Sequence, residues 1–114
     1  RLRLPLGRIL WNLMIKAHAN ANRPKAAESW VIDMLERIYQ PDIITYNTLL
    51  NCFGRLGQFL KSETWMRRMR ARGVEPDMYS YGSLANAYAK DGDMKNTERV
   101  VRELLDSGIE LVPS

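Results

Sequence analysis

The chain has very little cysteine or histidine. Its 114 residues include one cysteine, Cys52, and one histidine, His18. A lone cysteine cannot form a disulfide within the chain, and one histidine leaves no Cys/His cluster with the spacing of metal ligands. We therefore expect no structural zinc, no disulfide-linked partner and no cofactor, with Cys52 and His18 as packed residues.

Long apolar runs and loop-forming residues are also scarce. Uninterrupted apolar stretches such as residues 9–11 and 43–44 have only two or three residues, whereas a bilayer-spanning helix needs about 20. Seven glycines and five prolines are too few for a disordered or collagen-like chain. The sequence therefore predicts one small packed unit without membrane insertion, and its net charge of +4 is compatible with an anionic partner such as nucleic acid.

An internal repeat dominates the sequence. When the chain is shifted by 35 residues, segment 41–75 aligns with 76–110 without a gap, and 10 of the 35 positions are identical. The same offset places Asn12 over Asn47, which extends the repeat into the N-terminal third. Periods of about 20 to 50 residues are typical of stacked supersecondary units. The chain is therefore predicted to consist of three tandem repeats.

Each repeat carries two helical patterns separated by a turn. In the second repeat, apolar residues recur every three or four positions, first at Tyr46, Leu49, Leu50 and Phe53, then at Phe59, Trp65, Met66 and Met69. Gly57, Gly92 and Asn22 follow the first helices, because these residues tolerate the positive φ of a helix end. Thr45 and Ser80 are expected to cap the first helices. A single helical hairpin cannot bury its apolar face, so the repeats are predicted to stack.

The repeat resembles the pentatricopeptide repeat family. Tetratricopeptide arrays have a period of about 34 and a different pattern of Trp, Leu-Gly, Tyr, Ala, Phe and Pro. The run TYNTLL from Thr45, the turn at Gly57, Met69 and the closing GVEPD from Gly73 are instead similar to pentatricopeptide repeats. The resemblance implies an all-α fold, an α-solenoid of three helix-turn-helix repeats in a right-handed superhelical stack. The repeats are expected at residues 8–42, 43–77 and 78–112, with 1–7 as the end of a preceding repeat or an N-terminal extension and 113–114 as a tail.

The resemblance also implies RNA-binding side chains along one groove. The family's base-reading positions correspond to Asn12 with Asp42 and to Asn47 with Asp77, a combination similar to its uridine-preferring pair. Its base-stacking positions correspond to Ile9, Ile44 and Tyr79, and its phosphate-contacting positions to Arg55 and Lys90. The third repeat departs from the pattern, because Gly82 and Val112 stand where Asn and Asp are expected. We therefore expect at most two specified nucleotides, both uridine.

Structural explanations compete with these assignments. Asp before a helix often caps it, and Asn in a first turn hydrogen-bonds locally, so the Asn/Asp pairs also suit a structural role. Trp30 and Trp65 are expected in the core rather than as stacking platforms. The basic run of Arg67, Arg68, Arg70 and Arg72 is either a solvated outer face or a surface that docks on RNA phosphates or an acidic protein.

The leading hypothesis from the sequence is a non-catalytic module that binds single-stranded RNA. It would be a piece of a longer protein of the mitochondrion or plastid that acts in RNA processing, stability or translation. The alternative is a structural subunit that docks on protein or ribosomal RNA within a large organellar assembly such as a mitochondrial ribosome. No nucleophile with its base, Gly-rich phosphate loop or paired-carboxylate arrangement indicates catalysis, so the chain is predicted not to be an enzyme.

Overall fold

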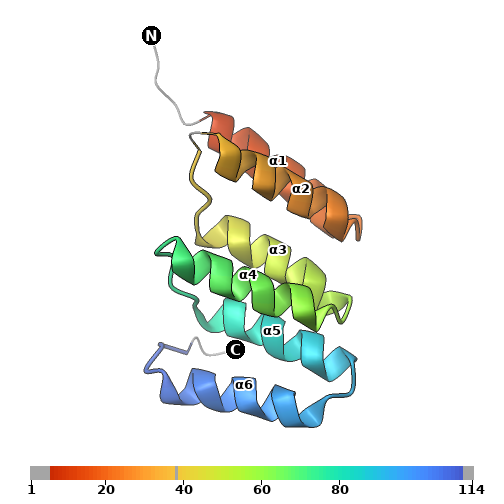
Figure 1. Cartoon of the computed structure of the whole chain (residues 1–114), viewed down its shortest axis with the longest axis vertical. Helices are drawn as coiled ribbons and strands as arrows, with labels where there is room; N and C mark the ends of the chain where they lie inside the picture. The colour runs from red at the N-terminus through yellow and green to blue at the C-terminus, as the bar shows by residue number, and fades with distance from the viewer. Residues whose placement is uncertain (1–5, 38, 112–114) are drawn as a thin grey trace.

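The computed structural model describes residues 6–37 and 39–111, which form six α-helices. In chain order these are α1 (Leu6–Asn20), α2 (Pro24–Glu36), α3 (Ile43–Arg55), α4 (Phe59–Ala71), α5 (Met78–Lys90) and α6 (Met94–Asp106). The helices form three antiparallel pairs that stack along the longest dimension of the molecule, with extents of 52 × 29 × 27 Å (Figure 1). The predicted all-α stack of helix pairs is thereby confirmed. Among the described residues, no helix is both long and apolar enough to cross a membrane.

The first helices of the pairs form the spine of the stack. We call α1, α3 and α5 the A helices and α2, α4 and α6 the B helices. α3 packs between α1 and α5, while α2 and α4 each pack against their own A helix and against the A helix of the next pair. Each pair therefore buries an apolar face against its neighbour, as expected for a hairpin too small to form a core alone.

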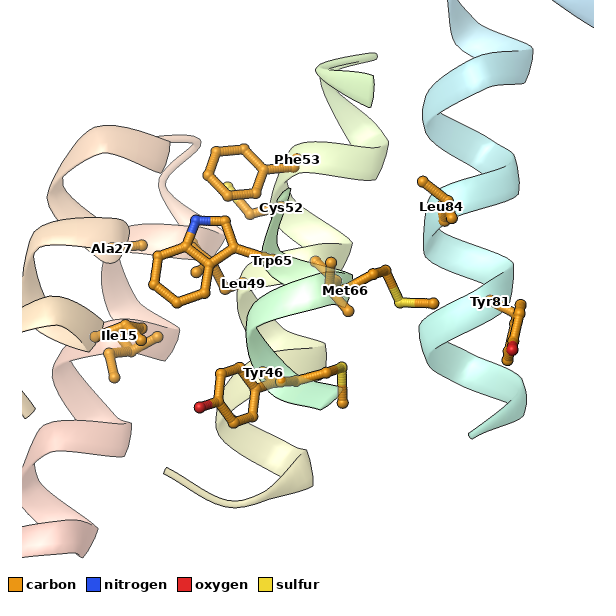
Figure 2. Packing of buried hydrophobic residues seen from close by; sticks show 14 of the residues in the cluster. Ile15, Ala27, Tyr46, Leu49, Cys52, Phe53, Trp65, Met66, Tyr81 and Leu84 are labelled. Carbon is orange, nitrogen blue, oxygen red and sulfur yellow. The ribbon is translucent and has the colours of Figure 1, made fainter. Parts of the chain in front are cut away.

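One apolar core runs through the stack. Its largest fully buried side chains include Trp65, Tyr46 and Phe53. Figure 2 shows Trp65 beside Ala27 of the first pair. The predicted core position of Trp65 is confirmed, and Trp30 is half-buried against the same cluster. Burial raises the pKa of the Cys52 thiol, so this cysteine stays protonated as a packed side chain.

The turns inside the helix pairs have the geometry predicted from sequence. Asn22, Gly57 and Gly92 have φ angles of 58°, 70° and 78°. This left-handed conformation lets the backbone N–H groups after the helix reach the last carbonyl oxygens. Asn22 adopts the same conformation as the two glycines because its short polar side chain tolerates it.

The starts of α3 and α5 differ from the prediction. The N-caps are Asp42 and Asp77, whose carboxylates accept hydrogen bonds from the backbone N–H groups of Thr45 and Ser80, both at 3.0 Å. Thr45 and Ser80 are therefore the third residues of these helices and are buried. A carboxylate is the stronger cap here because its negative charge also interacts favourably with the helix dipole.

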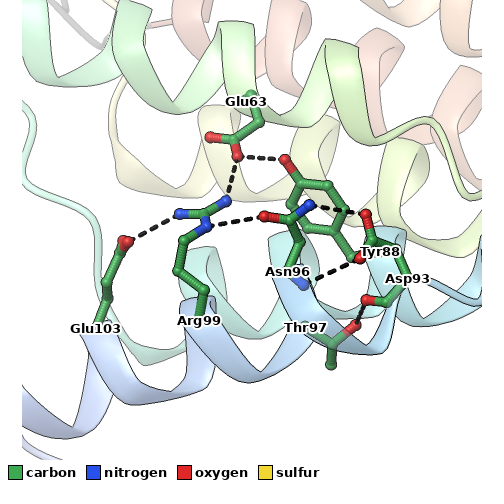
Figure 3. A network of polar contacts seen from close by, with 7 residues as sticks. All are labelled: Glu63, Tyr88, Asp93, Asn96, Thr97, Arg99 and Glu103. Atoms are coloured by element: carbon green, nitrogen blue, oxygen red, sulfur yellow. Dashed lines mark hydrogen bonds and ion pairs between the residues drawn. The ribbon is translucent and has the colours of Figure 1, made fainter.

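Polar contacts also join successive B helices, on the side of the stack that α2, α4 and α6 form. Glu28 of α2 accepts hydrogen bonds from Lys61 and, at 2.7 Å, from the Trp65 indole of α4. Glu63, the equivalent residue one repeat later, accepts from Tyr88 of α5 and, at 2.8 Å, from Arg99 of α6 (Figure 3). Burial and the contact with Glu63 raise the pKa of Tyr88 to about 12.

The core predicts a sharp contrast between two leucines. Leu49 is fully buried in α3, whereas Leu60 of α4 is 73% exposed. Leu49→Ala should lower the free energy of unfolding by about 2–5 kcal/mol because it leaves a cavity at the centre of the stack. Leu60→Ala should change it by less than about 0.5 kcal/mol. Urea unfolding followed by circular dichroism measures both, and equal losses would contradict this packing.

Candidate nucleic-acid interface

A groove of about 610 Å³ lies along the A helices. α1 contributes Lys16, Ala19 and Asn20, and the remaining lining comes from α3 and the start of α5. Five residues that the sequence assigned to RNA binding line this groove together: Ile44, Asn47, Arg55, Asp77 and Tyr79. The other assigned positions that are described, Ile9, Asn12, Asp42 and Lys90, lie outside its lining.

The predicted pair Asn47 and Asp77 is in direct contact. The Asn47 amide nitrogen of α3 donates a hydrogen bond of 3.0 Å to the Asp77 carboxylate, which caps α5. The Asn47 carbonyl oxygen accepts a bond of 2.5 Å from the Ser80 hydroxyl. The Ser80 hydroxyl also accepts from the Asp77 backbone N–H at 3.1 Å, which completes a capping box. We call this arrangement of Asn, capping Asp and hydroxyl the cap junction.

The cap junction keeps Asp77 ionised. Partial burial would raise its pKa, but the hydrogen bonds that its carboxylate accepts from the Ser80 backbone N–H and the Asn47 amide outweigh this. The pKa of Asp77 therefore lies below its usual value of 3.8. At neutral pH the carboxylate is an acceptor only, whereas Asn47 keeps a second amide hydrogen and a second lone pair.

The first two repeats meet at a second cap junction. The Thr45 hydroxyl of α3 donates to the Asn12 carbonyl oxygen of α1 at 2.5 Å, and Asp42 accepts from the Thr45 backbone. No hydrogen bond between Asn12 and Asp42 is found in this described region, unlike the Asn47–Asp77 contact. Asn12 and Asn47 therefore have equivalent positions on successive A helices and face the same kind of neighbour.

Two exposed side chains flank the Asn47–Asp77 contact. Ile44 and Tyr79 are each the second residue of an A helix, and they are 65% and 57% exposed. Both line the groove, so its polar centre lies between apolar surfaces from two repeats. Ile9, which lies 35 residues before Ile44 in the repeat, is also exposed.

The predicted phosphate-contacting residues lie against turns of the preceding repeat. The Arg55 guanidinium donates to the Ala19 carbonyl at 2.8 Å and to the Asn22 side chain at 3.1 Å. Lys90 is exposed, and its stem passes the equivalent turn, where a Cβ on Gly57 would lie 3.2 Å from the Lys90 Cβ. Arg55 therefore satisfies carbonyl and amide oxygens at the end of α1.

Sequence reasoning missed several groove residues. Lys16, Asn20, Asn51 and Ser83 line the groove, although no role was assigned to them. The signal was available in the spacing, because Lys16 and Asn51 each follow the assigned asparagine by four residues, which places them on the same helix face. Gly82 of the third repeat is exposed, as expected for a position without a reading side chain, and Val112 lies outside the described residues.

Arg67, Arg68 and Arg70 of α4, with the C-cap Arg72, lie on the B-helix side. Arg68 stacks over Trp65 with 4.7 Å to the ring centroid, and Arg70 donates to the Tyr81 hydroxyl at 2.7 Å. Over residues 6–37 and 39–111, neither these arginines nor Arg67 and Arg72 form an ion pair with a carboxylate. Arg37, directly after α2, and Arg99 of α6 do have such partners, Asp33 and Glu103. The exposed α4 face is therefore a concentration of uncompensated positive charge.

Stacked helix pairs with a polar groove along their first helices define an α-solenoid repeat protein. A profile of the PPR repeat family matches residues 7–55 and 41–90, and a profile of the PPR repeat matches residues 79–109. The chain belongs to the pentatricopeptide repeat (PPR) family. The repeat that defines this family is a non-catalytic RNA-binding unit.

Solved structures of one family member resemble the chain. The pentatricopeptide repeat protein PPR10 in complex with an 18-nt psaJ RNA element superposes on 96% of this chain with a TM-score of 0.83 and 28% sequence identity. The crystal structure of PPR10 from maize matches 91% of the chain with a TM-score of 0.78 and 25% identity. The chain spans about 16% of the length of PPR10. Among curated proteins, no sequence match is found.

The cap junction predicts an acid-sensitive contribution to stability. Asp77→Ala should lower the free energy of unfolding at pH 7 by about 1 kcal/mol, since it removes the N-cap of α5. Because the pKa of Asp77 is lowered by folding, this stabilisation is complete above the usual value of 3.8 and is lost as the pH falls through the folded-state pKa. Chemical unfolding between pH 7 and pH 2 should show the wild type and the variant converging.

The matched control is Asp91→Ala at the other end of α5. Asp91 is exposed and follows the last helical residue, where a negative charge gains nothing from the helix dipole. This variant should cost no stability. A loss as large as that of Asp77→Ala, or a difference from wild type that persists in acid, would contradict the capping role.

Proposed function

We propose that the chain binds single-stranded RNA along the A-helix groove, with about one nucleotide for each of the repeats at 8–42, 43–77 and 78–112. The observation that carries the proposal is the Asn47–Asp77 contact. It brings an amide and an ionised carboxylate together in a groove flanked by exposed apolar side chains. Family membership and the similarity to PPR10 bound to an RNA element support the same function.

The chemistry of the pair favours uracil. The uracil edge has one N–H donor between two carbonyl acceptors. Asn47 has an amide hydrogen left to donate, and the ionised Asp77 can only accept, so a base with an N–H donor at its centre is favoured. Cytosine has an unprotonated ring nitrogen at that place, which the carboxylate repels. For Asn12 and Asp42 in the first repeat, the proposed uridine preference rests on the resemblance of this pair to the family's uridine-preferring combination.

Apolar contacts supply the affinity that is independent of sequence. A base between Ile44 and Tyr79 would cover two side chains that are more than half exposed. Stacking of a base on an aromatic ring contributes about 1–3 kcal/mol, and every base has a face that stacks. Ile9 would serve in the same way in the first repeat, and Lys90 remains a predicted phosphate contact.

The biological role follows from the family. We propose that the chain is part of a longer mitochondrial or plastid PPR protein that holds an RNA for processing, stability or translation. Two uridine-reading repeats define too few bases for a unique site. Further specificity would therefore have to come from other parts of the same protein.

The base-reading proposal predicts a defined change in preference. The wild type should bind oligouridine more tightly than oligoadenosine at fixed salt. Asn12→Ala combined with Asn47→Ala should remove this preference, because each lost base-edge contact is worth about 1–3 kcal/mol of discrimination. Fluorescence anisotropy with labelled RNAs of six to eight nucleotides measures both affinities, with Gln40→Ala, an exposed residue outside the groove, as the control. Equal affinity of the wild type for both RNAs would refute base reading.

A second candidate function rests on the uncompensated arginines of α4. The chain would then be a structural subunit that docks on ribosomal RNA or protein within an organellar assembly such as a mitochondrial ribosome. Charge on an exposed helix face suits a large polyanionic surface.

Charge reversal separates the two candidates. Arg67→Glu with Arg72→Glu avoids Arg68 and Arg70, which contact aromatic rings. The docking function predicts that this variant no longer co-sediments with the assembly, while the double asparagine variant still does. Loss of co-sedimentation in the asparagine variant alone would instead support the groove.

A further inference from the structure

Equivalent positions of the three A helices form three rows along the stack, and five residues of these rows line the groove: Lys16, Asn20, Asn47, Asn51 and Arg55. Residues four apart lie on the same helix face, about 6 Å apart along the axis. The first row holds Asn12, Asn47 and Gly82, the second Lys16, Asn51 and Asn86, and the third Asn20, Arg55 and Lys90. In repeats two and three the positive charge stands in the third row, whereas in repeat one it stands in the second.

Lys16 is a free cation within the groove. It is an exposed residue of α1 that lines the same groove as Asn47 and Asp77. Its ammonium group has no carboxylate or carbonyl partner in the part of the chain that the structure describes. Because an ammonium group on a flexible stem can turn toward any nearby anion, Lys16 can meet a phosphate without giving up an existing contact.

Arg55, the other cation of the groove, is already engaged. Its guanidinium holds the Ala19 carbonyl and the Asn22 side chain, and its Nε is buried without an acceptor. Turning toward a phosphate would break both bonds, so that the Asn22 side chain would lose the guanidinium and the Ala19 carbonyl would keep only the Asn22 backbone N–H, at 3.1 Å. Loss of a hydrogen-bond partner in a partly buried place is costly.

A nucleotide in the groove needs a cation close to its phosphate. Asp77 is ionised, so the groove holds a negative charge before any RNA arrives. The phosphodiester adds another, and the repulsion must be offset by positive charge from the protein. Lys16 is the lining cation that is free to supply it.

We infer that Lys16 of the first repeat binds the phosphate of the nucleotide whose base Asn47 and Asp77 read. Arg55 then serves as a clamp between the first two repeats. The phosphate contact thus comes from the repeat that precedes Asn47. It lies in the second row, one helical turn closer to the base-reading row than the third-row position that the sequence pattern predicted. This inference rests on the proposed function, because it needs RNA in the groove.

The test is the salt dependence of RNA binding. Each phosphate neutralised on a single strand contributes about 0.7 to the slope of log K against log salt concentration. Binding of labelled oligouridine is measured by anisotropy at several KCl concentrations for the 114-residue chain and its variants. Lys16→Gln should reduce the slope by about 0.7, and Lys16→Arg should keep it.

Arg55→Gln should leave the slope unchanged but lower the melting temperature, because it removes the contacts to Ala19 and Asn22. Arg55→Lys, which keeps the charge but not the paired hydrogen bonds, should show the same loss of melting temperature. Lys95→Gln is the matched control, since Lys95 is an exposed lysine of α6, away from the groove. It should change neither quantity.

The outcomes separate the inference from the proposed function. An unchanged slope in Lys16→Gln, with oligouridine binding and its dependence on Asn47 intact, overturns the role of Lys16 alone. A reduced slope in Arg55→Gln, with an unchanged slope in Lys16→Gln, would show that Arg55 and not Lys16 contacts the phosphate, which also overturns the inference. If the wild-type chain binds no RNA at any salt concentration, the proposed function and this inference both fall.

Discussion

The hydrogen bonds of the cap junction set the relation between successive repeats. Asp77 ends the turn after α4 and starts α5, and it is held by Asn47 from the preceding A helix. The Ser80 hydroxyl bonds to both of these residues. Because the donors and acceptors are short side chains, they fit only when α3 and α5 are in one register. The junction therefore orients the polar groups that we propose to read a base, and stability and recognition share the same atoms.

The B-helix side and the A-helix side of the stack have different roles. The apolar core and the Glu28 and Glu63 contacts join the helix pairs on the B-helix side, where Lys61 and Arg99 are ion-paired and the arginines from Arg67 to Arg72 are not. The A-helix side keeps its polar groups partly unsatisfied and open to solvent, with Ile44 and Tyr79 exposed beside them. Exposed apolar side chains beside free hydrogen-bonding groups suit a planar ligand with a polar edge, such as a nucleotide base.

The fold was predictable because the same pattern of a helix pair occurs three times in the sequence. Apolar spacing and the residues at Asn22, Gly57 and Gly92 predict the helix pairs and their turns. The helix starts could not be predicted, because both an Asp and a hydroxyl residue were available as N-caps. Only the structure shows that Asp42 and Asp77 cap α3 and α5. The Arg55 contact with the Ala19 carbonyl was also hidden, since it joins residues that are far apart in the chain and depends on a backbone oxygen that no sequence pattern displays.

The most direct measurement is the side-chain amide spectrum of Asn47 by NMR during titration with a short RNA. If the groove reads uridine, oligouridine shifts the two amide proton resonances of Asn47 together with the ring resonances of Tyr79, and oligoadenosine shifts the ring resonances but moves the amide far less. If the Asn47 amide stays unmoved while the arginine resonances of α4 shift, RNA binds on the opposite side and the account of the groove is wrong.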